Sequence, residues 1–129
     1  MEYFYCDASA IISLFKENKL EALSQYKDIF HIADLQLKYE LLYPEGIKNA
    51  SINSITVDET TIDLLEAVIP IKQQHKSLSN FDALALVFCI KKNYCLVTND
   101  IRLQKATTHY GIACVTKEYI DDMFINKRG

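Results

Sequence analysis

Short apolar segments rich in β-branched and aromatic residues alternate along this chain with longer segments in which apolar residues recur at helical spacing. The pattern predicts strands at residues 3–6, 29–32, 54–57, 95–98 and 112–115. It predicts helices at residues 8–17, 20–26, 35–43, 60–74, 81–92, 101–110 and 117–126. This alternation is typical of a mostly parallel sheet with helices on its faces. We therefore expect an α/β fold with a central sheet of four to five strands.

The middle of the chain carries the weakest pattern. Pro44 and Gly46 both disfavour continuation of the helix that precedes them. Residues 48–53 are polar, and we expect a loop there. Pro70 should kink or end the helix in which it lies, whereas Gly111 marks a helix C-terminus.

Size and charge limit what the protein can be. The chain has 129 residues, of which 50% are hydrophobic, so it fits one domain spanning residues 1–129. A chain of this length buries roughly 68% of its unfolded surface without extra cross-links. Its formal net charge of -3 argues against nucleic-acid binding through bulk positive charge. Any contact with nucleic acid must then be local or mediated by metal.

The four cysteines, Cys6, Cys89, Cys95 and Cys114, show neither a CxxC pattern nor a Cys/His ligand spacing and lie among apolar residues. We interpret them as buried thiols rather than as a zinc site or a disulfide framework. Together with the absence of a signal peptide, this indicates a cytoplasmic protein. The longest apolar run, residues 83–90, is far shorter than the roughly 20 residues that span a bilayer.

Four acidic residues are distant in sequence but fall at related places in the predicted sheet. Asp7 and Asp100 each follow a strand, and the carboxyl ends of parallel strands meet at one edge, where open α/β sheets bind ligands. Asp82 lies in the first turn of its helix, and Glu40 lies inside the helix after the second strand. Carboxylates that lie close together repel one another unless a cation compensates their charge. The pattern therefore predicts a magnesium or manganese site.

Each of these residues also has a structural explanation. Asp7 and Asp100 suit helix N-caps, and Ser79 with Asp82 resembles a capping box. Glu40 alone would be an ordinary solvated helix residue. Capping and metal binding do not exclude each other, and the convergence of all four residues on one edge favours a site.

Four segments of the chain, residues 5–9, 38–42, 78–86 and 96–100, resemble the motifs of PIN domains, most closely the small toxins of the VapC type. The similarity covers nearly the whole chain in order. Its most specific parts are the Ser-x-x-Asp-Ala helix start at Ser79 and the apolar strand that ends in Thr-Asn-Asp at Asp100. The motif around Glu40 is little more than apolar, and Glu45 lies nearby. The resemblance implies a three-layer α/β/α PIN-like domain.

The resemblance further implies a metal-dependent endoribonuclease that hydrolyses RNA phosphodiester bonds. Asp7, Glu40, Asp82 and Asp100 would hold one or two Mg²⁺ or Mn²⁺ ions. Such an ion lowers the pKa of an attacking water and neutralises charge on the leaving oxygen. The supporting residues implied by the same motifs, through hydrogen bonds to the carboxylates, are Ser9, Thr98 and Asn99. The preference for RNA over DNA comes from the resemblance alone.

Contacts to substrate and to partner proteins are also expected. Arg102 and Lys105 lie on the helix after Asp100 and are candidates for phosphate contacts, with a solvated helix face as the alternative. The resemblance implies a homodimer that acts as the toxin of a type II toxin-antitoxin pair, with a small antitoxin protein as its partner.

Three alternative functions make different demands on these residues. A non-catalytic PIN-like module that binds RNA or protein would keep the acidic residues only as helix caps. A receiver domain needs an acidic pair after the first strand and a lysine at the end of a late strand. A haloacid-dehalogenase-like phosphatase needs an Asp-x-Asp motif at the first strand, whereas this chain has Asp7, Ala8 and Ser9 at that place.

Overall fold

A five-stranded, all-parallel sheet forms the centre of the protein in a computed structural model that describes residues 2–126. The strands follow the order β3-β2-β1-β4-β5 across the sheet. They are β1 (Phe4–Cys6), β2 (Phe30–Ala33), β3 (Thr56–Asp58), β4 (Cys95–Val97) and β5 (Cys114–Val115). The expected α/β class is confirmed, and the first strand of the chain lies in the middle of the sheet.

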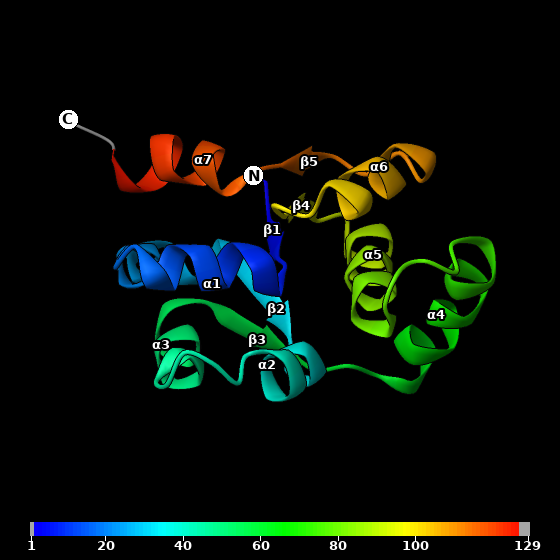
Figure 1. The fold of residues 1–129 in the computed structure, drawn as a ribbon, viewed down its shortest axis with the longest axis horizontal. Coiled ribbons are helices and arrows are strands. Elements are labelled where there is room, and N and C mark those ends of the chain that lie inside the picture. Colours follow the sequence, from blue (N-terminus) through cyan, green and yellow to red (C-terminus); the bar gives the residue numbers. More distant parts are fainter. Residues whose placement is uncertain (1, 127–129) are drawn as a thin grey trace.

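Helices cover both faces of this sheet (Figure 1). They are α1 (Ala8–Lys16), η1 (Leu20–Ile29), α2 (Asp34–Glu40), α3 (Ile47–Ser54), α4 (Ile62–Gln74), α5 (Asn80–Lys92), α6 (Ile101–His109), α7 (Lys117–Ile120) and η2 (Asp121–Ile125). In Figure 1, α1, α3 and α7 lie to the left of β1 and β2, whereas α4 and α5 lie to the right. The three-layer α/β/α arrangement follows from this placement.

The central strand β1 is buried on both faces, which explains its continuous apolar sequence. Successive side chains of a strand point to opposite faces. Phe4 stacks on Phe30, with ring centroids 5.2 Å apart, and contacts Phe124 on the same face. Tyr5 instead packs against Phe88 of α5, at a centroid distance of 5.5 Å. The core therefore consists of two aromatic layers, one on each side of the sheet.

One expectation about the middle of the chain is wrong, and one of the two alternatives for Pro70 is excluded. Residues 48–53 form most of helix α3, although their sequence is polar. The helix buries Ile47, Ser51 and Ser54 against the protein, and the Ser51 hydroxyl donates a hydrogen bond to the Ile47 carbonyl at 2.8 Å. Pro70 does not end α4, which continues to Gln74. Both Pro70 and Glu66, four residues earlier, are exposed, so water can hydrate the carbonyl that proline leaves without a donor.

Smaller differences concern the ends of elements. Helix α2 ends at Glu40, three residues earlier than expected, so Glu40 stands at its last turn. All four cysteines are free; Cys114 is partly exposed and the other three are buried, as predicted. Across residues 2–126, no helix is both long and apolar enough to cross a lipid bilayer.

Candidate functional site

The acidic site begins where β1 and β4 end side by side. These strands are parallel, with Cys6 opposite Val97, and the Asp7 backbone N–H donates to the Val97 carbonyl at 2.9 Å. Asp7 follows β1, and residues 98–100 follow β4. The expected placement of Asp7 and Asp100 at one edge of the sheet is therefore confirmed.

The Asp7 carboxylate is buried and held by three side chains. Its Oδ2 accepts hydrogen bonds from the Ser9 hydroxyl at 3.0 Å and from the Thr98 hydroxyl at 2.9 Å. Its Oδ1 accepts one from the amide Nε2 of Gln36 at 2.8 Å. Asp7 precedes α1 but makes no side-chain capping bond. The capping interpretation is therefore wrong for this carboxylate. Asp7 is only 4% exposed, and its oxygens accept hydrogen bonds from three neighbouring side chains instead.

Of the three residues expected to support the carboxylates, two contact Asp7 directly. Ser9 and Thr98 do so, and the Thr98 hydroxyl also accepts the Asp100 backbone N–H at 3.1 Å. Asn99 makes no hydrogen bond to the carboxylate of Asp7 or of Asp100. Its backbone N–H donates to Ser9 Oγ at 3.2 Å, and its side chain donates to Ser13 Oγ at 3.2 Å. Asn99 therefore supports the site one step away, through Ser9.

Glu40 lies at the end of α2 and faces the same group of side chains. Its Oε1 accepts a hydrogen bond from Gln36 Nε2 at 2.8 Å. Burial raises the pKa of Glu40, partly opposed by this hydrogen bond. The negative charges of Asp7 and Asp82 raise the same pKa further. Glu40 is thus electrostatically coupled to two of the other predicted carboxylates.

Asp82 serves as the third residue of α5 and completes a capping box with Ser79. The Asp82 N–H donates to Ser79 Oγ, and the Ser79 N–H donates to Asp82 Oδ2, both at 3.0 Å. Burial raises the pKa of Asp82, although the Ser79 bonds oppose the shift. The charges of Asp7 and Asp100 raise that pKa as well. Asp82 therefore caps its helix and also faces the acidic site.

Asp100 is the N-cap of α6, as the capping interpretation predicts. Its Oδ1 accepts the backbone N–H groups of Arg102 at 2.9 Å and Leu103 at 3.4 Å. Its Oδ2 has no hydrogen bond to any described residue. The same holds for Oδ1 of Asp82 and Oε2 of Glu40. Three of the four carboxylates therefore keep one oxygen available for another ligand.

A divalent cation fits this donor set by its chemistry. The residues supply carboxylate oxygens, which hard cations prefer, and the crowding of negative charge raises two of their pKa values. The acidic side chains are, however, too far apart for three of them to bind one metal ion directly. Within residues 2–126, no three His, Cys, Asp or Glu side chains lie close enough together to hold a metal ion.

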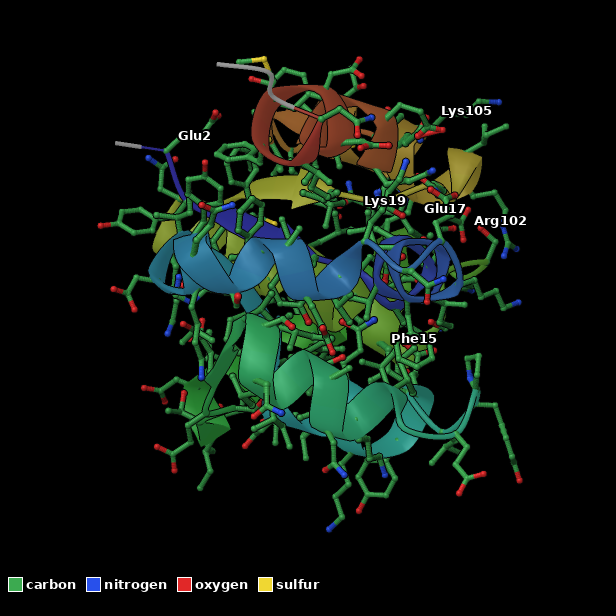
Figure 2. All side chains as sticks on the ribbon, turned by 90° about the vertical axis from the view of Figure 1, so that its left-hand side faces the viewer. Glu2, Phe15, Glu17, Lys19, Arg102 and Lys105 are labelled. Carbon is green, nitrogen blue, oxygen red and sulfur yellow. The ribbon has the colours of Figure 1, made fainter. Side chains whose placement is uncertain are left out.

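Arg102 and Lys105 are exposed on α6, beside the acidic residues. Arg102 Nε lies 3.9 Å from Asp100 Oδ1, and the arginine side chain is 66% exposed. Figure 2 shows both basic side chains reaching outward at the margin of the molecule opposite Glu2. Arg102 therefore stands next to Asp100, and Lys105 lies further along the same helix, also exposed to solvent.

Sequence reasoning missed Gln36, which joins Asp7 to Glu40. The signal was present as a polar residue among apolar ones on the buried side of a short helix, four positions before Glu40. Side chains at positions i and i+4 of a helix lie on one face. Gln36 is fully buried, which a glutamine tolerates only when its polar atoms find partners.

Comparison with known proteins identifies the fold. No protein-family model matches the chain, and no curated protein matches it. Several solved structures share its architecture. PAE2754 from Pyrobaculum aerophilum aligns with a TM-score of 0.67 at 19% identity, covering 92% of this chain and 86% of that one.

The second similar structure is a PilT N-terminus domain protein, SSO1118, from the archaeon Sulfolobus solfataricus P2. It aligns with a TM-score of 0.63 at 16% identity and covers 98% of this chain and 97% of its own. At such low identity the comparison identifies the fold alone. The chain thus has the PIN-like fold, the fold of a PilT N-terminus domain, with its acidic residues gathered at the carboxyl edge of the sheet.

Proposed function

We propose that this protein is a metal-dependent endoribonuclease that hydrolyses RNA phosphodiester bonds. The observation that carries the proposal is the mutual influence of the acidic residues. The charges of Asp7 and Asp82 raise the pKa of Glu40, and the charges of Asp7 and Asp100 raise the pKa of Asp82. Such crowding disfavours ionisation, so it opposes a purely structural use of four acids and suits a cation site.

Mg²⁺ or Mn²⁺ would be held by Asp7, Glu40, Asp82 and Asp100. When bound, the ion would activate a water for attack on phosphorus and neutralise charge on the leaving oxygen. The chain's own residues prepare that chemistry. Ser9 and Thr98 fix the Asp7 carboxylate through two hydrogen bonds to one oxygen, so its rotamer does not depend on the ion.

Arg102 and Lys105 would contact the phosphates that flank the scissile bond. Both lie on α6, directly after Asp100, and both carry their charge in solvent. Phosphate contacts of this kind position a nucleic acid without reading its sequence. They would offset the repulsion between RNA and a chain whose formal net charge is -3.

The experiment is a cleavage assay on purified protein with labelled RNA and Mn²⁺, alongside the variants Asp7→Asn and Asp82→Asn. We expect both variants to lose activity by roughly 100-fold or more, because losing a group that merely orients a metal ligand already costs about 10- to 100-fold. Asp63→Asn is the matched control, since Asp63 is an exposed acid in the first turn of α4. Equal cleavage by the wild type and Asp7→Asn would identify a contaminant and defeat the proposal.

The preference for RNA is tested in the same assay with a DNA oligonucleotide of matching sequence. Cleavage of RNA but not of DNA supports ribonuclease activity. A toxin role in a type II toxin-antitoxin pair, with a homodimer bound by a small antitoxin protein, is the biological setting we propose. Induced expression in bacterial cells should then arrest growth, whereas Asp7→Asn expressed at the same level should not.

A second candidate is a non-catalytic RNA-binding or protein-interaction module. The observation in its favour is that Asp82 and Asp100 both act as helix caps. Calorimetric titration with Mn²⁺ separates the two functions. Binding by the wild type that disappears in both Asp7→Asn and Asp100→Asn supports the nuclease, whereas a wild type that binds no Mn²⁺ supports the module.

A further inference from the structure

A buried glutamine lies between two of the acidic residues. Gln36 is 0% exposed and lies on α2, four residues before Glu40. Its Nε2 donates to Asp7 Oδ1 and to Glu40 Oε1, each at 2.8 Å. A primary amide has two N–H donors, so both hydrogens are used on the two carboxylates. Hydrogen bonds to ionised acceptors are the stronger kind, and here they reduce the repulsion between the two acids.

Tyr5 fixes which way this amide points. The Tyr5 hydroxyl donates to Gln36 Oε1 at 2.5 Å and accepts the Ala33 backbone N–H at 3.2 Å. A flipped amide would turn its oxygen toward the two carboxylates and lose both hydrogen bonds to them. Tyr5 is itself 0% exposed and packs against Phe88. A series of hydrogen bonds therefore connects the backbone of β2, through Tyr5 and Gln36, to the acidic site.

This series of hydrogen-bonded groups determines how far apart the carboxylates of Asp7 and Glu40 stand. The two hydrogen bonds start from one planar nitrogen, are each 2.8 Å long and point about 120° apart. The accepting oxygens of Asp7 and Glu40 therefore lie roughly 5 Å from each other. Such a distance exceeds the span of two oxygens that both touch one small cation at about 2.1 Å. These two oxygens therefore do not share one ion, and Oε2 of Glu40, which has no hydrogen bond to any described residue, is the oxygen that stays available to a cation.

We propose that Gln36, held by Tyr5, is the positioning residue of the carboxylate site. It sets the orientation of Asp7 and Glu40 before any ligand arrives, and thereby determines how strongly the site binds a divalent cation. This inference rests on the proposed function in its metal-binding part. Its geometric part, the locked amide between the two carboxylates, is independent of that function.

The metal-binding part is tested by titrating Mn²⁺ into the wild type, Gln36→Met and Tyr5→Phe by calorimetry. Methionine keeps the length of glutamine and an apolar body but has no donor, so we expect affinity about 10- to 100-fold weaker. Tyr5→Phe keeps the ring and both amide donors of Gln36 but removes the hydroxyl that bonds Gln36 and the Ala33 N–H, so it should weaken binding by a smaller factor. Ser51→Ala is the matched control, since it removes a buried hydroxyl inside α3 and should leave affinity unchanged. Affinities of both variants within twofold of the wild type would overturn the proposal.

The geometric part is tested without metal by nuclear magnetic resonance. The Gln36 side-chain amide should exchange its hydrogens far more slowly than that of exposed Gln25, and Tyr5→Phe should remove much of this protection. In Gln36→Met, the carboxyl signals of Asp7 and Glu40 should shift while that of Asp63 stays in place. Exchange as fast as in Gln25 would overturn the locked amide. If the wild type binds no Mn²⁺ but the amide is protected, the nuclease proposal fails and the amide bridge stands.

Discussion

Three aspartates of the site stand at helix N-termini, yet their side chains do different things. Asp100 and Asp82 accept backbone N–H groups of their own helices, as good capping residues do. Asp7 precedes α1 in the same way, but its oxygens accept hydrogen bonds from Ser9, Thr98 and Gln36 instead. Position in the helix therefore does not determine the role of the carboxylate. The neighbouring elements decide it.

At the residue scale, Glu40→Gln should stabilise the protein in EDTA at pH 7. Burial, followed by the charges of Asp7 and Asp82, raises the pKa of Glu40 in the fold. A raised folded pKa means that the stabilising contribution is present below the unfolded pKa and is lost as pH rises through the folded pKa. We expect a gain of about 0.5–1 kcal/mol at pH 7, measured by urea unfolding, and a smaller gain at pH 4.

The control for this change is Glu45→Gln, because Glu45 is an exposed glutamate five residues further along. It should alter the free energy of unfolding by less than about 0.5 kcal/mol. A loss of stability in Glu40→Gln, or an equal gain in both variants, would contradict the crowding of charge at the site.

Asp58 should show the opposite dependence on pH. Burial alone would raise the pKa of Asp58, but hydrogen bonds from His31 at 2.9 Å and Tyr94 at 2.7 Å, with the charge of Lys92, outweigh it and lower that pKa. Its stabilising contribution is therefore present above pH 3.8 and is lost as pH falls through the lowered value. Asp58→Ala should cost about 1.5–3 kcal/mol at pH 7, measured by urea unfolding.

The pH profile separates this effect from a simple loss of packing. As pH falls below 3.8, the difference between Asp58→Ala and the wild type should shrink, because the unfolded wild type takes up a proton there that the folded carboxylate resists. Asp63→Ala, at an exposed acid, should track the wild type at both pH values. A cost that stays constant between pH 7 and pH 3 would assign the role of Asp58 to packing.

The sequence predicted that Asp7 and Asp100 lie at one edge of the sheet, but not which side chains hold the acidic residues in place. Asp7 and Asp100 could be placed because both follow apolar strands, and parallel strands end at a common edge. Gln36 could not be placed, since its role requires that Tyr5 presents a donor to the oxygen of its amide and that Asp7 presents an acceptor to the nitrogen. The position of Asn99 was expected, but its partners, Ser9 and Ser13, depend on the packing of α1 against the residues after β4.

At the scale of elements, periodicity identified the strands and the long helices and failed where tertiary contacts outweigh pattern. Helix α3 has a polar sequence, and it forms because Ile47, Ser51 and Ser54 are buried by the rest of the protein. Helix α4 passes through Pro70 because Pro70 and Glu66, whose carbonyl loses its donor, are both exposed to water. By contrast, the capping box predicted at Ser79 forms as expected, because its two hydrogen bonds are local.

The capping box provides a prediction at this scale. Ser79→Ala removes the hydroxyl that accepts the Asp82 N–H, which should cost about 1 kcal/mol of stability. Ser77→Ala, at an exposed serine just before the helix, should cost nearly nothing. Urea unfolding measures both. The Asp82 carboxylate accepts the Ser79 backbone N–H, which alanine keeps, so Ser79→Ala should leave Mn²⁺ affinity nearly unchanged. A large loss of affinity would show that the hydroxyl also orients the Asp82 side chain.

At the scale of the whole molecule, the net negative charge repels the expected substrate, RNA. The chain has 17 acidic and 14 basic residues, with four of the acids gathered at one edge of the sheet. Attraction of RNA must then come from a few cations near that edge. Arg102 and Lys105 stand there, on the side of the molecule away from Glu2 (Figure 2).

Arg102→Ala should therefore weaken RNA binding by the Asp7→Asn protein, which is used so that the RNA stays intact during the measurement. If Arg102 touches a phosphate, the slope of log affinity against log salt should fall by roughly one unit, since each neutralised phosphate releases condensed counterions. Lys27→Ala is the matched control, because Lys27 is exposed and precedes β2, at the amino edge of the sheet. Fluorescence anisotropy with a labelled RNA, from about 50 to 200 mM salt, measures both slopes. A slope unchanged in Arg102→Ala would remove this arginine from the RNA path, and a slope reduced equally in Lys27→Ala would show that RNA is attracted by the surface as a whole.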